Sequence, residues 1–257
     1  MYELTARYDR SQSSISECIN GLVDILDSRW NHLLDFDTDG VLHPDALCSY
    51  ADAIRKAGAP AQTIWGFIDC TIRRICRPSI FQRVVYNGYK KYHALKFQAV
   101  VLPNGLFGHL YGPIEGRRAD TGMLNESKLI EACEEPAFTE NGAGERQYLQ
   151  IYGDSAYGLS RVLMSPYSGP GELSADELEW NRFMGSVRIE VEHTFGVVSR
   201  TWPFLNAGWK LRLLSSPVGT YYRVGVLLTN AMNCIRPNQI SQVFNLDPPS
   251  LEEYFHD

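Results

Sequence analysis

The chain has 257 residues, of which 44% are hydrophobic, and its 24 Lys and Arg against 30 Asp and Glu give a net charge of −6. This size and composition predict one main domain with a substantial core. No apolar run reaches the length of a membrane span, and the first seven residues lack the apolar core of a secretory signal, so we expect a soluble intracellular protein without a membrane partner. Six scattered cysteines without a CxxC pair indicate neither a zinc site nor a disulfide framework.

The charge is unevenly distributed along the chain. Residues 70–114 contain no Asp or Glu but hold seven basic residues: Arg73, Arg74, Arg77, Arg83, Lys90, Lys91 and Lys96. Such a segment creates a local positive field that attracts a polyanion although the whole chain is acidic. A basic face that only keeps the protein solvated is the alternative interpretation.

Residues 1–58 read as a helical N-terminal segment. From Ser14 to Leu34 apolar residues recur with a period close to 3.6, and Ser11 is a candidate N-cap. Residues 4–8 followed by 11–16 resemble the turn and second helix of a truncated helix-turn-helix unit. A purely structural helical lead-in explains the same pattern.

The next segment, residues 59–236, alternates strand and helix patterns. The bulky run at residues 64–68 predicts a buried strand that ends at Asp69. Residues 96–102 and 106–111 flank Pro103-Asn104-Gly105 and predict a β-hairpin. Asp120 stands at the expected start of a helix, and the predicted strand at residues 148–152 is followed by Asp154.

The second half of the chain is predominantly helical in pattern. Residues 131–146 and the surroundings of 169–171 predict exposed connections. A capping box at Ser174 opens a helix toward Trp180, a second helix is expected at 186–200, and a third begins near Pro217 and ends near Ile235. An acidic C-terminal tail follows at residues 237–257. This order predicts an α/β fold with a mixed sheet flanked by helices.

Three acidic residues lie where a metal-dependent nuclease would need them. Asp69 and Asp154 follow strand-like runs, and Glu192 lies in a helical pattern. Carboxylates placed so can converge at one edge of a sheet and bind Mg²⁺ or Mn²⁺, the chemistry of phosphodiester cleavage by two ions. Glu190 competes with Glu192 as the third acid, because helical projection puts the two on opposite flanks of one apolar stripe.

Five stretches together carry a resemblance to a known family. From about residue 50 to 236 the chain resembles the DDE superfamily endonucleases of Harbinger-type transposons, through residues 65–71 (WGFIDCT), 86–93 (YNGYKKYH), 116–120 (GRRAD), 153–157 (GDSAY) and 188–196 (RIEVEHTFG). The resemblance implies a ribonuclease H-like domain, a catalytic and metal-binding triad of Asp69, Asp154 and Glu192, and Asp120 as a further acidic metal-binding position. Cys70 and Ala119 depart from the Gly and His usual in the family.

The resemblance and the charge pattern together predict the partners. We expect double-stranded DNA to be bound by Arg73, Arg74, Lys90, Lys91 and Arg188, the last of which could instead orient Glu192. A separate DNA-binding partner protein, a homodimer for paired-end cutting and a location in the nucleus are further expectations. The leading hypothesis is a magnesium-dependent, transposase-like DNA endonuclease. The alternative is a domesticated, non-catalytic module that keeps the fold for binding DNA or protein.

Overall fold

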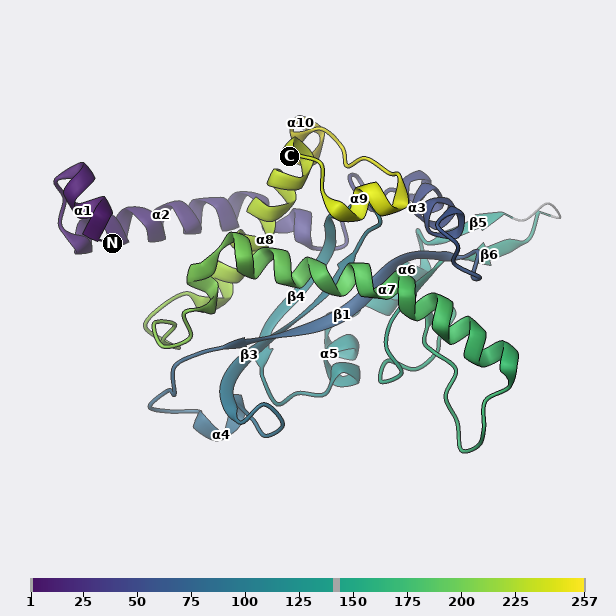
Figure 1. Cartoon of the computed structure of the whole chain (residues 1–257). Coiled ribbons are helices and arrows are strands. Elements are labelled where there is room, and N and C mark those ends of the chain that lie inside the picture. Colours follow the sequence, from purple (N-terminus) through teal and green to yellow (C-terminus); the bar gives the residue numbers. More distant parts are fainter. Residues whose placement is uncertain (1, 141–143, 257) are drawn as a thin grey trace.

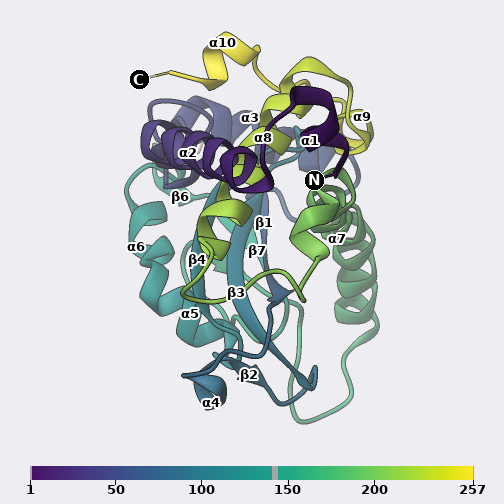
Figure 2. The same ribbon diagram turned by 90° about the vertical axis from the view of Figure 1, so that its left-hand side faces the viewer.

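The computed structural model describes residues 2–140 and 144–256, without the side chains of Tyr2 and of residues 190–192. A mixed sheet forms the centre of the described chain, with helices on both of its faces (Figure 1, and turned in Figure 2). None of the helices in these ranges is long and apolar enough to cross a membrane. The expected α/β fold with a mixed, helix-flanked sheet is confirmed.

The strands run in the order β4-β3-β1-β7-β8 across the sheet. The long strands β1 (Ile64–Arg74), β3 (Tyr92–Val101) and β4 (Phe107–Glu115) form an antiparallel unit in which β3 pairs with both β1 and β4. The short strands β7 (Gln150–Tyr152) and β8 (Leu163–Met164) continue the sheet parallel to β1. β2 (Tyr86–Asn87) pairs with the first residues of β3, while β5 (Phe138–Glu140) and β6 (Arg146–Tyr148) form a separate hairpin.

The predicted hairpin between β3 and β4 is confirmed. Gly105 has a φ of +83°, a conformation that L side chains rarely adopt, and a Cβ atom there would collide with the side chain of Asn238. The side chain of Asn104 accepts a hydrogen bond from the Leu106 N–H at 3.1 Å. Both turn residues are therefore required by the local backbone.

Strand β1 is longer than its sequence indicates. The predicted strand ended at Asp69, but β1 pairs with β3 residue by residue as far as Arg74 opposite Ala94. The polar residues after Asp69 do not stop the strand, because β3 supplies hydrogen-bond partners for their backbone. Asp69 therefore projects from a face of the sheet rather than from the tip of a strand.

Alternation along β1 divides its side chains between two helical layers. Phe67, Asp69 and Arg73 point to the face covered by α7 (Ala175–Thr201), α8 (Val218–Ile235) and α9 (Gln239–Phe244), where Phe67 lies 6.4 Å from the ring of Phe244. Ile68 and Cys70 point to the other face, on which α5 (Asp120–Ser127) lies (Figure 1). α6 (Leu129–Glu134) follows α5 directly.

The N-terminal segment is helical, as predicted. It forms α1 (Tyr2–Tyr8), α2 (Gln12–Trp30), the 3₁₀ helix η1 (Asn31–Leu34) and α3 (Pro44–Lys56), and the Ser11 side chain caps α2 by accepting from the Ser14 N–H. Residues 4–8, the expected turn of a helix-turn-helix unit, lie instead inside α1. Figure 1 shows α1 and the first half of α2 extending away from the sheet.

Several boundaries in the second half differ from those expected. The capping box at Ser174 is confirmed, but the two helices predicted after it are the single helix α7. Residues 131–146, expected as an exposed connection, contain the end of α6 and strand β5. The predicted strand at 148–152 is divided between β6 and β7, and Pro217 precedes α8 as expected. The short elements α4 (Gln82–Val85), β2, β8 and η2 (Pro203–Asn206) were not predicted.

The C-terminal segment belongs to the core. Residues 237–257 were expected to form a tail, but they contain α9 and α10 (Leu251–Tyr254), and Phe244 and Tyr254 are buried. Asn230 of α8 connects this segment to the sheet. Its fully buried amide accepts from the Phe107 N–H at 2.9 Å and donates to the Phe107 carbonyl and to the Tyr254 hydroxyl, both at 2.9 Å.

We expect Asn230→Ala to lower the free energy of unfolding by on the order of 3 kcal/mol, because it leaves a buried N–H and a buried carbonyl of Phe107 without partners. Urea unfolding followed by circular dichroism measures the change. Asn206→Ala is the matched control, since this exposed amide makes a single bond to the Ser199 carbonyl. Equal losses in the two variants would contradict the role given to Asn230.

Candidate active site

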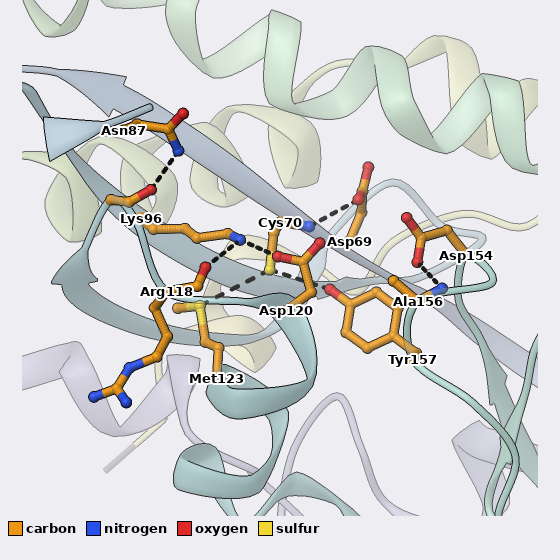
Figure 3. A network of polar contacts seen from close by, with 11 residues as sticks. Asp69, Cys70, Asn87, Lys96, Arg118, Asp120, Met123, Asp154, Ala156 and Tyr157 are labelled. Atoms are coloured by element: carbon orange, nitrogen blue, oxygen red, sulfur yellow. Dashed lines mark hydrogen bonds and ion pairs between the residues drawn. The ribbon is translucent and has the colours of Figure 1, made fainter. Parts of the chain in front are cut away.

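Asp69 lies on β1, and Asp154 lies just beyond the end of β7, the strand that pairs with β1 in parallel. Phe67 of β1 pairs with Tyr152 of β7, and each aspartate comes two residues later in its own segment. Gly153 still donates to the Met164 carbonyl at 2.9 Å, so the strand geometry continues past Tyr152. Adjacent strands lie about 4.8 Å apart. Figure 3 shows the two carboxylates on the same side of β1.

The turn after β7 fixes the orientation of Asp154. Its Oδ1 accepts from the Ala156 N–H at 2.9 Å, and its carbonyl accepts from the Ser165 hydroxyl at 2.9 Å. Gly153 allows this turn to close on β1, because a Cβ atom there would lie 2.7 Å from the Tyr157 ring and 2.9 Å from Ile68. The aspartate is therefore held by its own backbone, as in an Asx-turn.

Asp69 is positioned by its own strand and by α7. Its Oδ1 accepts from the Cys70 N–H at 2.8 Å, and its Oδ2 lies 3.5 Å from Nη2 of Arg188. The side chains of Asp69 and Arg188 are 23% and 17% exposed, so the pair is sheltered but reachable from solvent. Arg188, expected to contact DNA or to orient Glu192, thus lies beside the first aspartate.

Helix α7 crosses the sheet over both aspartates. The ring of Trp180 lies 5.7 Å from that of Tyr152 on β7, Arg188 reaches Asp69, and Ser199 contacts Arg73 further along β1. Glu190 and Glu192 belong to α7, but their side chains lie outside the described residues. Position 192 falls on the stretch of helix that passes along β1 between Asp69 and Arg73.

Asp120 lies on the opposite face of the sheet. It is the first residue of α5, as expected, and its carboxylate pairs with Nζ of Lys96, which also donates to the Arg118 carbonyl at 3.0 Å. Lys96 pairs with Ile72 in the register of β1 and β3, and therefore shares the face of Cys70. The structure does not bring Asp120 to the face that carries Asp69.

Cys70 fills the space between Asp69 and Asp120 (Figure 3). Its Sγ lies 3.1 Å from the hydroxyl of Tyr157 and 3.8 Å from Sδ of Met123 (Figure 3). Burial raises the pKa of the Cys70 thiol to about 12, so the group stays protonated and is a poor nucleophile. The contact joins β1, α5 and the turn after Asp154, and nothing in the sequence identified Tyr157 as its partner.

The basic residues expected to bind DNA fall into two groups. Arg73 points inward and donates to the Phe195 carbonyl at 3.3 Å and the Tyr222 hydroxyl at 3.1 Å, so it connects β1 to α7 and α8. This placement does not support its predicted contact with DNA. Arg74, Lys90 and Lys91 are exposed. Their positions leave them available to a phosphate backbone.

The donor set suits a hard divalent cation. Asp69 and Asp154 offer carboxylate oxygens from a rigid sheet, which are the ligands that Mg²⁺ and Mn²⁺ prefer. Among the side chains that the structure describes, no three His, Cys, Asp or Glu form a metal-binding group. The expected third ligand, Glu192, lies outside that set, so the described part of the site consists of two aspartates.

The protein-family model described as DDE superfamily endonuclease matches residues 68–230, more than half of the chain. The chain belongs to this family. Neither the curated proteins nor the solved structures gave a match to this DDE endonuclease chain.

The family match covers most of the sheet and the helix α7 that contacts Asp69. It begins one residue before Asp69, includes Asp120, Asp154 and α7, and ends at Asn230 in α8. The resemblance to DDE superfamily endonucleases inferred from the five sequence stretches is confirmed. The helical segment before β1 and the segment with α9 and α10 lie outside the matched range of this DDE endonuclease.

We expect Lys96→Met to destabilise the protein by on the order of 3 kcal/mol, because it leaves the sheltered Asp120 carboxylate without its cation. The double variant Lys96→Met/Asp120→Leu should be more stable than Lys96→Met alone, since neither charge remains. A double-mutant cycle of unfolding free energies measures the coupling. Arg118→Gln is the control, because the Arg118 guanidinium is itself exposed and its ion pairs with Glu115 and Glu126 should contribute little. A double variant less stable than Lys96→Met would refute the assignment.

Proposed function

We propose that this DDE endonuclease cleaves DNA phosphodiester bonds with divalent cations, Mg²⁺ or Mn²⁺, held by Asp69, Asp154 and Glu192. The observation that carries the proposal is the pairing of the two aspartates. Each follows by two residues the paired Phe67 and Tyr152 of adjacent parallel strands, and their carboxylates lie on one side of β1, the side on which α7 carries Glu192. Two metal ions bound at such a group of carboxylates are the arrangement that phosphodiester cleavage uses.

The strand order supports a ribonuclease H-like assignment for the domain. Three antiparallel strands in sequence, β1, β3 and β4, make up one half of the sheet, and β7 and β8 extend it on the other side of β1, parallel to that strand. In this order the first and fourth main strands are neighbours. Their neighbouring positions explain why Asp69 and Asp154, 85 residues apart in the chain, lie side by side.

The contacts of α7 favour Glu192 over Glu190 as the third acid. Arg188 contacts Asp69, and position 192 follows one turn later on the same flank of the helix. Position 190 precedes Thr194 by one turn, and Thr194 and Val197 line a separate cavity against Gln239 and Ile240 of α9. Helical periodicity alone left both acids open, whereas the packing of α7 assigns each flank a different neighbour.

Each side chain then has a defined task. Bound cations would activate the attacking hydroxyl and neutralise the scissile phosphate. The Cys70 N–H orients Asp69 and the Ala156 N–H orients Asp154, so both carboxylates are preorganised. Arg188 partly balances the negative charge of Asp69. Asp120 anchors Lys96 on the opposite face and acts as a support for β3 rather than as a ligand.

The ion pair between Arg188 and Asp69 also favours the second candidate function. A guanidinium 3.5 Å from the carboxylate supplies some of the positive charge that a cation would supply. A domesticated descendant that binds DNA without cutting it could keep this pair and the fold. For both candidate functions we propose double-stranded DNA as the partner and the nucleus as the location. A separate DNA-binding protein or a second copy of the chain would complete the assembly.

Nicking of supercoiled plasmid in the presence of Mg²⁺ or Mn²⁺ tests the proposal. We expect Asp154→Asn and Glu192→Gln to reduce the rate by on the order of 10³-fold, because losing a metal ligand removes several kcal/mol of charge stabilisation. Glu190→Gln is the matched control on the same helix and should retain activity. Equal nicking by wild type and Asp154→Asn would reject the active site. DNA binding without nicking by any of these proteins would support the non-catalytic module.

Metal binding has a readout that does not require cleavage. Because a cation bound only by the folded state stabilises it, added Mn²⁺ should raise the thermal midpoint of the wild type. The shift should be lost in Asp69→Asn/Asp154→Asn and retained in Asp120→Asn after correction for its own lower stability. An equal Mn²⁺ shift in wild type and Asp69→Asn/Asp154→Asn would place the cation elsewhere.

A further inference from the structure

Two segments without acidic residues meet at one end of the sheet. The first is 70–114, and the second is 193–246, which contains no Asp or Glu but holds Arg200, Lys210, Arg212, Arg223 and Arg236. The Cys76 N–H donates to the Leu211 carbonyl at 2.9 Å, and a Cβ atom on Gly208 would lie 3.0 Å from Cγ of Arg74. Figure 1 shows the connection between α7 and α8 beside the chain that leaves β1. The sequence separates these segments, but the fold combines their positive charge.

A polar cavity of about 380 Å³ lies between the two segments. Arg77 and Ser79 line it from the side of β1, and Arg212 and Ser215 line it from the connection between α7 and α8. Nε of Arg77 donates to the Gln82 side chain at 3.0 Å, which helps to orient its guanidinium. The described lining contains no carboxylate. Two guanidinium groups and two hydroxyls around one cavity are donors suited to a phosphate.

The surroundings of the cavity suit a nucleic-acid strand. Lys210 is exposed on the same connection, and the neighbouring Trp209 is 74% exposed, which is unusual for so large an apolar ring. Tyr89, beside Lys90 and Lys91, is 87% exposed. Exposed rings interleaved with cations are typical of surfaces on which bases stack while the backbone is held electrostatically.

The cavity lies beyond the end of the strand that carries Asp69. From Asp69 to Arg74, β1 advances five residues, or roughly 17 Å. That span corresponds to about five nucleotides of one DNA strand at ~3.4 Å each. A backbone that passes Asp69 and runs in the direction of β1 would therefore reach the acid-free surface several nucleotides from the scissile bond.

We propose that Arg77, Arg212, Ser79 and Ser215 form a binding site for a DNA backbone phosphate that flanks the cleavage position. The inference deepens the proposed function, because it takes DNA as the substrate, but it requires no cleavage. The site holds the strand in register with the aspartates. It explains how a chain of net charge −6 binds a polyanion: the positive field is concentrated where two acid-free segments meet.

Salt-dependent DNA binding tests this site separately from catalysis. Fluorescence anisotropy with labelled duplex DNA is measured in Asp154→Asn without divalent metal, across a range of salt concentrations. Adding Arg77→Gln/Arg212→Gln should weaken binding at low salt and reduce the slope of log K against log salt by about 1, since one phosphate is no longer neutralised. Arg77→Lys/Arg212→Lys should restore most of the slope, because charge is retained. Arg55→Gln/Lys56→Gln on α3 removes the same charge elsewhere and is the control.

The outcomes separate the two proposals. An unchanged slope in Arg77→Gln/Arg212→Gln, or an equal fall in the α3 control, would overturn the phosphate site while leaving the cleavage proposal intact. Conversely, a reduced slope in Arg77→Gln/Arg212→Gln together with no plasmid nicking by the wild type would refute the cleavage proposal and leave the phosphate site intact. If inorganic phosphate stabilises the wild type thermally but the pocket variant binds DNA normally, the cavity takes free phosphate and the inference is wrong. Thermal midpoints of all variants confirm that they are folded.

Discussion

The pairing of β1 with a partner on each side is the constraint on which the rest of the molecule depends. β3 holds β1 extended as far as Arg74, and β7 meets it in parallel register at Phe67 and Tyr152. Because side chains alternate along a strand, this register decides which groups share a face. A shift of β1 by one residue would move Asp69 to the side of α5 and bring Cys70 opposite α7. The chemistry on one face and the packing on the other are therefore fixed together.

The two faces of β1 carry charge in different ways. On the α7 face, Asp69 and Asp154 place two carboxylates side by side, and among the described contacts Arg188 lies beside the first. A cation bound there would balance the negative charge of the two carboxylates. On the α5 face, Lys96 is buried at 6% exposure and Asp120 lies against it, so the charges compensate each other. Tyr157 and Cys70 pack between these regions. This arrangement supports the structural role that we propose for Asp120.

The sequence predicted most of what local chemistry determines. The Asn-Gly hairpin, the Ser174 capping box, the helical N-terminal segment and Asp120 at the start of α5 depend on short-range rules. It failed where partners distant in the chain decide the outcome: the extension of β1 beyond Asp69 requires β3, the inward turn of Arg73 requires Tyr222, and the burial of Tyr254 requires Asn230. Periodicity could not choose between Glu190 and Glu192, because the choice depends on what lies beside each flank of α7.

Charge distribution follows the same division between local and long-range information. The acid-free stretch at 70–114 can be read along the chain, but its effect depends on where the second stretch, 193–246, is placed. The hydrogen bond from Cys76 to Leu211 joins them at the end of β1, next to the cavity lined by Arg77 and Arg212. β1 thus runs from a pair of carboxylates suited to a cation to a cluster of cations suited to phosphate. A polyanion that passes the aspartates and reaches this cluster would meet attraction at the far end and would need bound metal at the aspartates, so cation binding and DNA alignment would reinforce each other.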